Sequence, residues 1–239
     1  ANTSGYVVYY YCVGNGNYSA KSGNVTTKIN KAINPIGITN KTVYAGSVTD
    51  LTTAVVGAQG NVTFEMVSSG TTTASTLSGS KLTAGTMSTT DDNAQTVVVK
   101  ATAEGNNNYN EGSKNLTITV QKYSVSLSWT STTPSSIVYG TTGKTATVTA
   151  TVSGGTKGAV TYTSGTTGVL AINASTGALT TAGVGSSTIT ASIARTTTVR
   201  AGSIARTISV TKATNPITVT ANTLTYNGKA QNLVTTAKA

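Results

Sequence analysis

Two stretches of this chain, GNGNYSAKSGNVTTKI (14–29) and GNNNYNEGSKNLTITV (105–120), align without a gap at an offset of 91 residues. A third and more diverged copy, ASIARTTTVRAGSIARTISV (191–210), follows about 90 residues later, with Val199 at the tyrosine position. The junctions NKAINPI (30–36) and TKATNPI (211–217) repeat as well. Self-similarity at a fixed period is the sequence signature of tandem repeats.

The repeat predicts two complete copies between two partial ones. The predicted segments are the C-terminal part of a repeat (1–33), a complete repeat (34–122), a second complete repeat (123–213) and the N-terminal part of a further repeat (214–239). Joined, the last and first segments would make most of one more domain. We therefore expect the strand near residue 6 to be a late strand, whose early partners lie upstream or belong to a neighbouring chain.

Short alternating segments predict the fold class. In TATVTATVS (145–153) alanine and valine alternate with threonine, which is the period of a half-buried strand. TVVVKATA (96–103), SSTITASI (186–193) and ARTISVT (205–211) follow the same rule between Gly, Asn and Ser residues. About seven such strands in each unit of about 90 residues predict an all-β chain of tandem immunoglobulin-like β-sandwich domains arranged in series.

The composition and charge of the chain indicate which kinds of partner it can bind. Charged residues make up 9% of the chain, and the formal net charge of +10 comes from scattered lysines and arginines. A nucleic-acid face would concentrate these residues among aromatic ones, so we expect no nucleic-acid binding. Attraction to anionic wall polymers fits scattered positive charge better. No apolar run is long enough to cross a bilayer, so we expect no membrane insertion in this segment.

The alignment of the copies also assigns the faces of the first strand. Val97, Val99, Ala101 and Ala103 are the apolar alternates of the second copy, and their counterparts Tyr6, Val8, Tyr10 and Cys12 are expected to point inward. Cys12 is then a buried, inert thiol. The outward stripe consists of Val7, Tyr9, Tyr11 and Val13. It is either a contact surface, since tyrosine is favoured at interfaces, or a stripe covered by other residues of the same domain.

Candidate polar sites are few. Arg195, Arg200 and Arg206 form the one local basic cluster, which could bind phosphate or carboxylate groups or form a solvated turn. The run Asp91-Asp92-Asn93 could touch calcium, although a solvated turn is favoured because further ligands are missing. Glu65 could catalyse a Lys–Asn crosslink only if buried, and its alternation with Phe64 and Met66 places it on the wet face.

A family resemblance accompanies these patterns. The stretch AVTYTSGTTGVLAINASTGALTTAGVGSSTITASI (159–193) resembles the bacterial immunoglobulin-like group 2 domain. The residues that fit its pattern are Val169, Leu170, Ile172, Gly177, Leu179, Thr181, Gly183, Gly185, Thr188 and Ile189. TNPITVTANTLTYNGKAQNL (214–233) and YVVYYYCVGNGNY (6–18) resemble the MBG type of repeat in bacterial surface proteins. In the turn RTTTVR (195–200) the tyrosine of the other copies is missing, which puts its contact in doubt there.

The resemblance implies extracellular sandwiches strung in series, and no shared catalytic residues. The chain has no histidine and only six acids, so we expect no enzyme and no cofactor. The expected role is a rod, stalk or fibre segment of a large bacterial surface or filament-forming protein. The alternatives are an adhesin module that binds surface glycans and a phage tail or capsid appendage in a virion. Neighbouring copies of the chain, or adjacent repeats, are the expected partners, with shared strands as one means of assembly.

Overall fold

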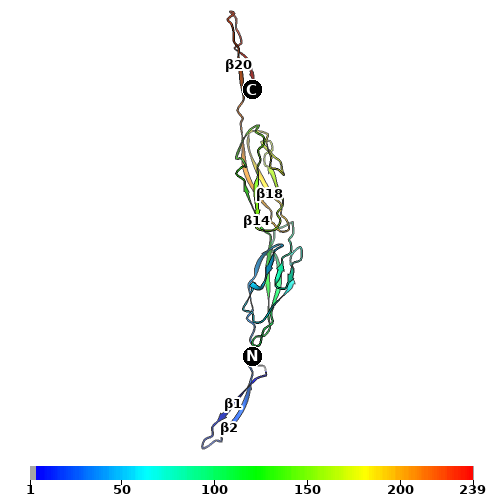
Figure 1. Cartoon of the computed structure of the whole chain (residues 1–239), viewed down its shortest axis with the longest axis vertical. Helices are drawn as coiled ribbons and strands as arrows, with labels where there is room; N and C mark the ends of the chain where they lie inside the picture. Colours follow the sequence, from blue (N-terminus) through cyan, green and yellow to red (C-terminus); the bar gives the residue numbers. More distant parts are fainter. Residues whose placement is uncertain (1–3, 239) are drawn as a thin grey trace. The chain divides into compact units, whose positions relative to one another are not determined.

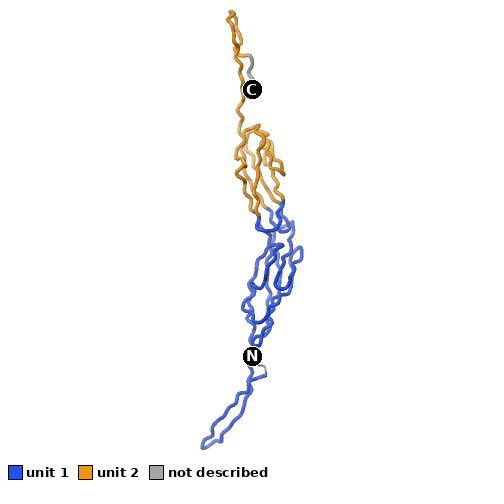
Figure 2. The backbone as a smooth tube through the Cα atoms, in the orientation of Figure 1, with its two compact units in different colours: residues 1–125, 152–158, 194–201 blue, residues 126–151, 159–193, 202–239 orange. Residues whose placement is uncertain are grey.

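The computed structural model describes residues 4–238, and this part of the chain consists of strands, turns and one short 3₁₀ helix, η1 (Thr52–Ala54) (Figure 1). The predicted all-β class with immunoglobulin-like sandwiches is confirmed. The chain divides into two compact units, one with residues 1–125, 152–158 and 194–201 and the other with residues 126–151, 159–193 and 202–239 (Figure 2). The repeat boundaries remain predictions from the sequence, and the predicted segments 1–33 and 214–239 begin and end outside the described residues.

The first unit holds a two-stranded hairpin and the sheets of one sandwich. The hairpin is formed by β1 (Tyr6–Cys12) and β2 (Lys21–Thr27). The larger sheet has the order β4 (Lys41–Tyr44), β11 (Gly112–Gln121), β10 (Gln95–Ala103), β7 (Val62–Ser68), with β4 parallel to β11. The opposing strands are β5 (Val48–Asp50), β9 (Lys81–Thr83) and β8 (Thr76–Ser78), together with the pair β3 (Gly37–Ile38) and β6 (Val55–Val56).

Alternation along the strands creates the core of this sandwich. Val97 and Val99 of β10 pack with Leu116 and Ile118 of β11, and against Leu82 of β9 on the other sheet. All five side chains are buried, as predicted for β10 from the period of its apolar residues. Full burial of one such side chain contributes about 1.5–3 kcal/mol, so the two facing rows hold the sheets together. The prediction for β7 is also confirmed, because Phe64 and Met66 pack against this core while Glu65 is exposed.

The second unit repeats this plan. Its larger sheet has the order β13 (Ser136–Val138), β19 (Gly202–Thr211), β18 (Gly185–Ile193), β15 (Val160–Ser164), with β13 parallel to β19. The other pairs are β12 (Val125–Trp129) with β14 (Val148–Val152), β16 (Leu170–Ile172) with β17 (Leu179–Thr181), and β20 (Thr218–Ala221) with β21 (Val234–Lys238). Ile189 and Ile208 are buried against Leu170 and Leu179.

The three long hairpins share one register. Tyr6 pairs with Thr27 in β1–β2, Val97 with Ile118 in β10–β11, and Ser187 with Ile208 in β18–β19. These pairs are 91 and 90 residues apart, and every further pair of the ladders keeps the same offsets. The repeat seen in the sequence is therefore a repeat of backbone pairing, and the inward positions of β18 are buried as predicted.

One turn closes all three hairpins. Asn15 Oδ1 accepts hydrogen bonds from the backbone N–H groups of the residues two and three positions later, and Asn106 Oδ1 does the same. In the diverged copy, Thr196 Oγ1 accepts from the N–H groups of Thr198 and Val199 at 3.3 and 3.0 Å. A threonine hydroxyl thus replaces the asparagine amide as the local acceptor. The turn survives the loss of the tyrosine, whose place is taken by the buried Val199.

The closing turn of each predicted complete repeat pairs with one residue of the linker, the short segment that joins the repeat to the one before it. This residue is Ala32 in the first case and Tyr123 in the second. Ala32 N–H donates to Asn108 O at 2.8 Å, and Ala32 O accepts from Asn110 N–H at 2.9 Å. Tyr123 makes the same two bonds with Thr198 O and Arg200 N–H, both at 2.9 Å. The loop 194–201 belongs to the first unit together with Tyr123. In both cases a residue at or just before the start of a predicted complete repeat pairs with the turn near the end of that repeat.

One local expectation needs correction. The strand predicted over 145–153 is regular only at Val148–Val152, because the Thr147 backbone bonds with the hydroxyl groups of Thr130 and Thr133. The motifs VYAG (43–46) and VYGT (138–141) are alike in sequence, but their tyrosines, Tyr44 and Tyr139, are not equivalent in the structure. Ala45 N–H donates to Gln121 O, and Tyr139 N–H donates to Thr211 O, so that Tyr139 corresponds to Ala45.

We expect Thr196→Val to destabilise the β18–β19 hairpin by about 1 kcal/mol, because two backbone N–H groups lose their acceptor and Thr156 O loses a donor. Thr196→Asn should retain most of the stability, since asparagine has this role in the other two turns. Urea unfolding followed by the fluorescence of Trp129, the only tryptophan of the chain, measures the change. Thr197→Val at the exposed neighbour is the control, and equal stability of both valine variants would contradict the role of the hydroxyl.

Candidate functional sites

The predicted tyrosine stripe lies on a hairpin that is open on both faces. Tyr9, Tyr11 and Val13 are 77%, 67% and 81% exposed, and Val7 is also exposed. The expected inward residues are exposed too, with Tyr10 at 46%. Within residues 4–238, β1 pairs only with β2 and no second sheet lies over either face.

Cys12 is exposed, so the prediction of a buried thiol is wrong. The physical reason is that alternation assigns a residue to a face but does not supply the opposing sheet. Its counterpart Ala103 is fully buried because the first sandwich has that second layer.

Three consecutive tyrosines shape a shallow pocket on this hairpin. The pocket has a volume of about 420 Å³ and is lined by Tyr9, Tyr10, Tyr11, Ser22, Gly23 and Asn24. The ring of Tyr10 reaches across to β2, where a Cβ atom at Gly23 would lie 2.5 Å from Tyr10 Oη. Flat aromatic surfaces beside hydroxyl and amide groups can stack on and hydrogen-bond a polar ring-shaped ligand.

The predicted arginine cluster is partly engaged within the protein. The Arg195 guanidinium donates to Thr90 O, and its Nη2 atom lies 3.7 Å from Asp92 Oδ2. Arg200 Nε is buried and has no hydrogen-bond partner. Arg206 lies on β19 opposite Ile189. Since Arg195 already has an acidic partner, it has fewer free donors for an external anion than the sequence alone implies.

The acid that pairs with Arg195 also holds a buried lysine. Lys122 is 1% exposed, and its Nζ atom donates to Asp91 O at 2.7 Å and to Asp92 Oδ1 at 3.1 Å. A buried ammonium group needs both a counter-charge and hydrogen bonds, and the run 91–92 supplies them. The expected solvated turn at Asp91-Asp92-Asn93 is therefore an internal ion-pair site.

The next residue of the linker is fixed by ring packing. Tyr123 stacks on Tyr44 with ring centroids 4.3 Å apart and an interplanar angle of 10°. A Cβ atom at Gly154 would lie 2.5 Å from Tyr123 Cζ, and one at Gly155 would lie 3.0 Å from Tyr123 Cδ2. The two glycines leave room for the ring. We call Tyr44, Asp92, Lys122, Tyr123 and Arg195 the linker cluster.

Sequence reasoning missed the linker cluster, although one signal was present. Lys31, Lys122 and Lys212 occupy the same position of the three linkers, at offsets of 91 and 90 residues. Lys31 and Lys212 are exposed, whereas Lys122 is buried. A repeated lysine next to a junction thus marks a position where a nearby acid can create an ion pair.

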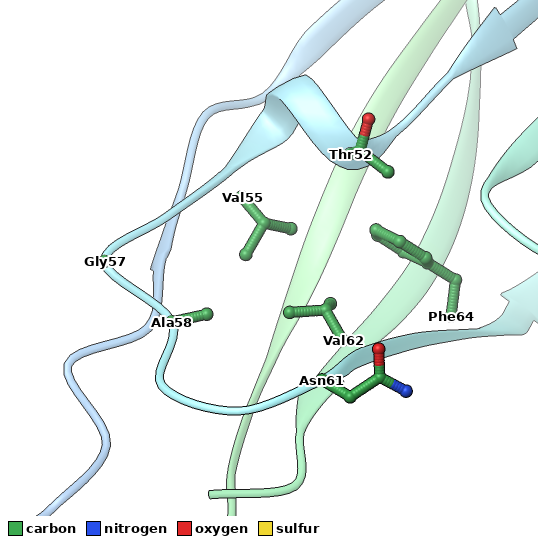
Figure 3. A pocket seen from close by; sticks show the side chains of 7 residues that line it. All are labelled: Thr52, Val55, Gly57, Ala58, Asn61, Val62 and Phe64. Atoms are coloured by element: carbon green, nitrogen blue, oxygen red, sulfur yellow. The ribbon is translucent and has the colours of Figure 1, made fainter.

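The other pockets and side-chain clusters of the described residues contain few groups that could bind a metal or catalyse a reaction. Thr52, Val55, Gly57, Ala58, Asn61, Val62 and Phe64 line a pocket of about 360 Å³ without an ionisable side chain (Figure 3). In residues 4–238 no three His, Cys, Asp or Glu side chains gather as metal ligands would, and no helix there is of the length and apolarity that a membrane span requires. The backbone N–H and then the hydroxyl of Thr52 donate to Asp50, which lowers the pKa of this exposed carboxyl.

Comparisons with known proteins give structural likeness only. No protein-family model matches the chain, and neither does any curated protein. Among solved structures, domains 1–6 of the surface layer protein SbsC are 16% identical over 89% of this chain and 32% of that one, with a TM-score of 0.36. SbsC domains 4 and 5 are 17% identical over 74% and 96%, with a TM-score of 0.35.

The protocadherin gammaB7 EC3–6 structure is 14% identical, with a TM-score of 0.31. That match covers 92% of this chain, which spans 60% of the protocadherin structure. The fold assignment rests on the strands and sheets described above.

We expect Asp92→Asn to lower the free energy of unfolding of the first sandwich by roughly 2 kcal/mol, because the buried Lys122 ammonium loses its counter-charge. Asp91→Asn is a matched control, since only the backbone carbonyl of Asp91 accepts from Lys122. Differential scanning calorimetry measures both variants. Lys122→Met in the Asp92→Asn background should recover part of the loss, whereas strictly additive effects would contradict a coupled pair.

Proposed function

We propose that this chain is a structural segment of a larger extracellular protein, in which tandem sandwiches lengthen a rod, stalk or fibre at a bacterial surface. The docked linker is the observation that carries the proposal. Lys122 and Tyr123 are both held by side chains and backbone groups, whereas a flexible tether would leave such residues in solvent. We expect a linker with few free residues to let each added repeat add reach.

Two features of the sequence support this role. The repeat of linker, hairpin and closing turn makes the same unit available for addition in series. The resemblance to bacterial immunoglobulin-like group 2 and MBG repeats supports an extracellular location. The absence of histidine is consistent with a role that needs no catalysis, and we propose that the chain is not an enzyme.

Small-angle scattering of the purified chain tests this proposal. We expect the scattering of an elongated particle, and the double variant Lys122→Ser/Tyr123→Gly should scatter as a more flexible one. This difference is the result expected of a cluster that limits bending, and loss of the cluster should leave the sandwiches folded. Thr180→Ser on the exposed face of β17 is the control variant. A compact globule for the unmodified chain would contradict the proposal, as would identical flexibility of the two variants.

The tyrosine pocket favours a second candidate function, the binding of a surface glycan. Exposed rings of Tyr9 and Tyr11 beside Ser22 and Asn24 offer stacking surfaces and hydrogen-bonding groups together. This candidate would make the segment an adhesin module as well as a spacer.

A glycan array measures this directly. We expect saturable binding that drops at least tenfold in Tyr9→Ala and in Tyr11→Ala, because each variant removes a stacking ring. Tyr226→Ala, at an exposed tyrosine outside the pocket, should bind like the unmodified chain. Equal binding by all three variants, or no saturable binding, would refute a role for the pocket.

A further inference from the structure

One face of β1 matches a buried face of the first sandwich position by position. Tyr6, Val8, Tyr10 and Cys12 occupy the ladder positions of Val97, Val99, Ala101 and Ala103. The second set is fully buried, and the first set is exposed. On β2, Val25 is exposed at the position of the buried Leu116. The hairpin therefore carries the apolar face of a sandwich core without the layer that covers it.

The first sandwich identifies the segment that covers one end of this face. Ile36 is buried in a cluster with Ala101 and Ala103, and Ile38 and Val55 of the β3–β6 pair pack against the same cluster. Asn34 anchors the segment, because its Nδ2 atom donates to Asn110 O at 3.2 Å. The segment that contains Asn34-Pro35-Ile36 and the β3–β6 pair is thus the natural cover of the Ala101 and Ala103 end.

The chain contains a second copy of this covering segment. Asn215-Pro216-Ile217 repeats the motif, and β20–β21 repeats the pairing that follows it. Thr218 pairs with Lys238 as Gly37 pairs with Val56. In the next position of each ladder, Val219 pairs with Ala237 as Ile38 pairs with Val55. Ile217 is 62% exposed, although its counterpart Ile36 is buried. An exposed covering segment and an exposed face of the matching kind occur in one polypeptide.

The side chains of the open face fit the same backbone register despite their size. Tyr10 is far larger than Ala101, but it lies opposite Gly23, whereas Ala101 lies opposite Lys114. The ring of Tyr10 occupies the space over Gly23 that a side chain would otherwise fill. The hairpin thus presents an apolar ring at the position where Ile36 packs in the first sandwich.

We propose that the face of β1 that contains Tyr10 and Cys12 binds the segment Asn215–Ala221 and its paired strand β21 from a second copy of this chain. In this contact an exposed apolar face of one copy is covered by an exposed segment of the other, as Ile36 covers the matching face in the first sandwich. Burial of Ile217 and of the Tyr10 ring, which are both exposed in the single chain, favours the contact. The contact is independent of the linker cluster, so it can fail while the proposed structural role stands.

Cys12, the only cysteine of the chain, makes disulfide trapping possible. In Ile217→Cys the two thiols should lie where Ala103 and Ile36 meet in the first sandwich. We expect mild oxidation of the full chain to give intermolecular disulfides between Cys12 and position 217 at least fivefold faster than disulfides to position 218 in Thr218→Cys, which places the thiol on the opposite face of the strand. Peptide mapping identifies the bond, and gel migration separates dimers and longer ladders from monomers.

Equal rates in the two cysteine variants would overturn the proposal, and so would a disulfide that joins Cys12 to position 217 of the same chain. A second measurement does not depend on a thiol. Sedimentation equilibrium under reducing conditions should show concentration-dependent association of the unmodified chain. Ile217→Asp should weaken this association at least tenfold, and Thr218→Asp should not. A chain that stays monomeric at all concentrations would also refute the contact.

Discussion

The backbone pairing between a linker residue and the closing turn of its repeat is the constraint on which the rest of this structure depends. Two hydrogen bonds join Ala32 to its turn, and two join Tyr123 to the next one. The turn must present one carbonyl and one N–H group to the linker at fixed positions. Asn106 and Thr196 hold this geometry, because their side-chain oxygens accept the other N–H groups of the turn. The side-chain acceptor therefore keeps the turn in the geometry with which the linker residue pairs.

Electrostatics then distinguishes one linker from the others. All three linkers have a lysine at the same position, but only Lys122 meets an acid within the described residues, since Asp92 approaches it from the loop before β10. Burial of an ammonium group is unfavourable by several kcal/mol unless its charge and its donors are satisfied. Asp92 and the carbonyl of Asp91 satisfy them here. The same sequence position is thus a solvated lysine in two linkers and a structural ion pair in the third.

Periodicity predicted the strands and most of their faces, because alternation and the 90-residue repeat both depend on backbone geometry. Val97, Val99 and Ile189 are buried where this pattern placed them. The pattern could not predict the exposure of Cys12, which depends on whether a second sheet is present. The sequence pattern also could not predict the linker cluster. Lys122 and the acids near position 92 are about 30 positions apart, and they meet only because the loop before β10 folds back on the linker.

The three hairpins also indicate why such repeats can diverge without loss of register. Their ladders coincide pair by pair although Tyr10 and Gly23 replace Ala101 and Lys114. The register is fixed by the closing turn and by main-chain bonds, so the side chains of a pair can change while the pairing is kept. One consequence is that a surface can be specialised on a common frame. The outward tyrosines of β1 occupy ladder positions at which β10 has lysine and threonine, and they create an aromatic surface without any change in the backbone that supports it.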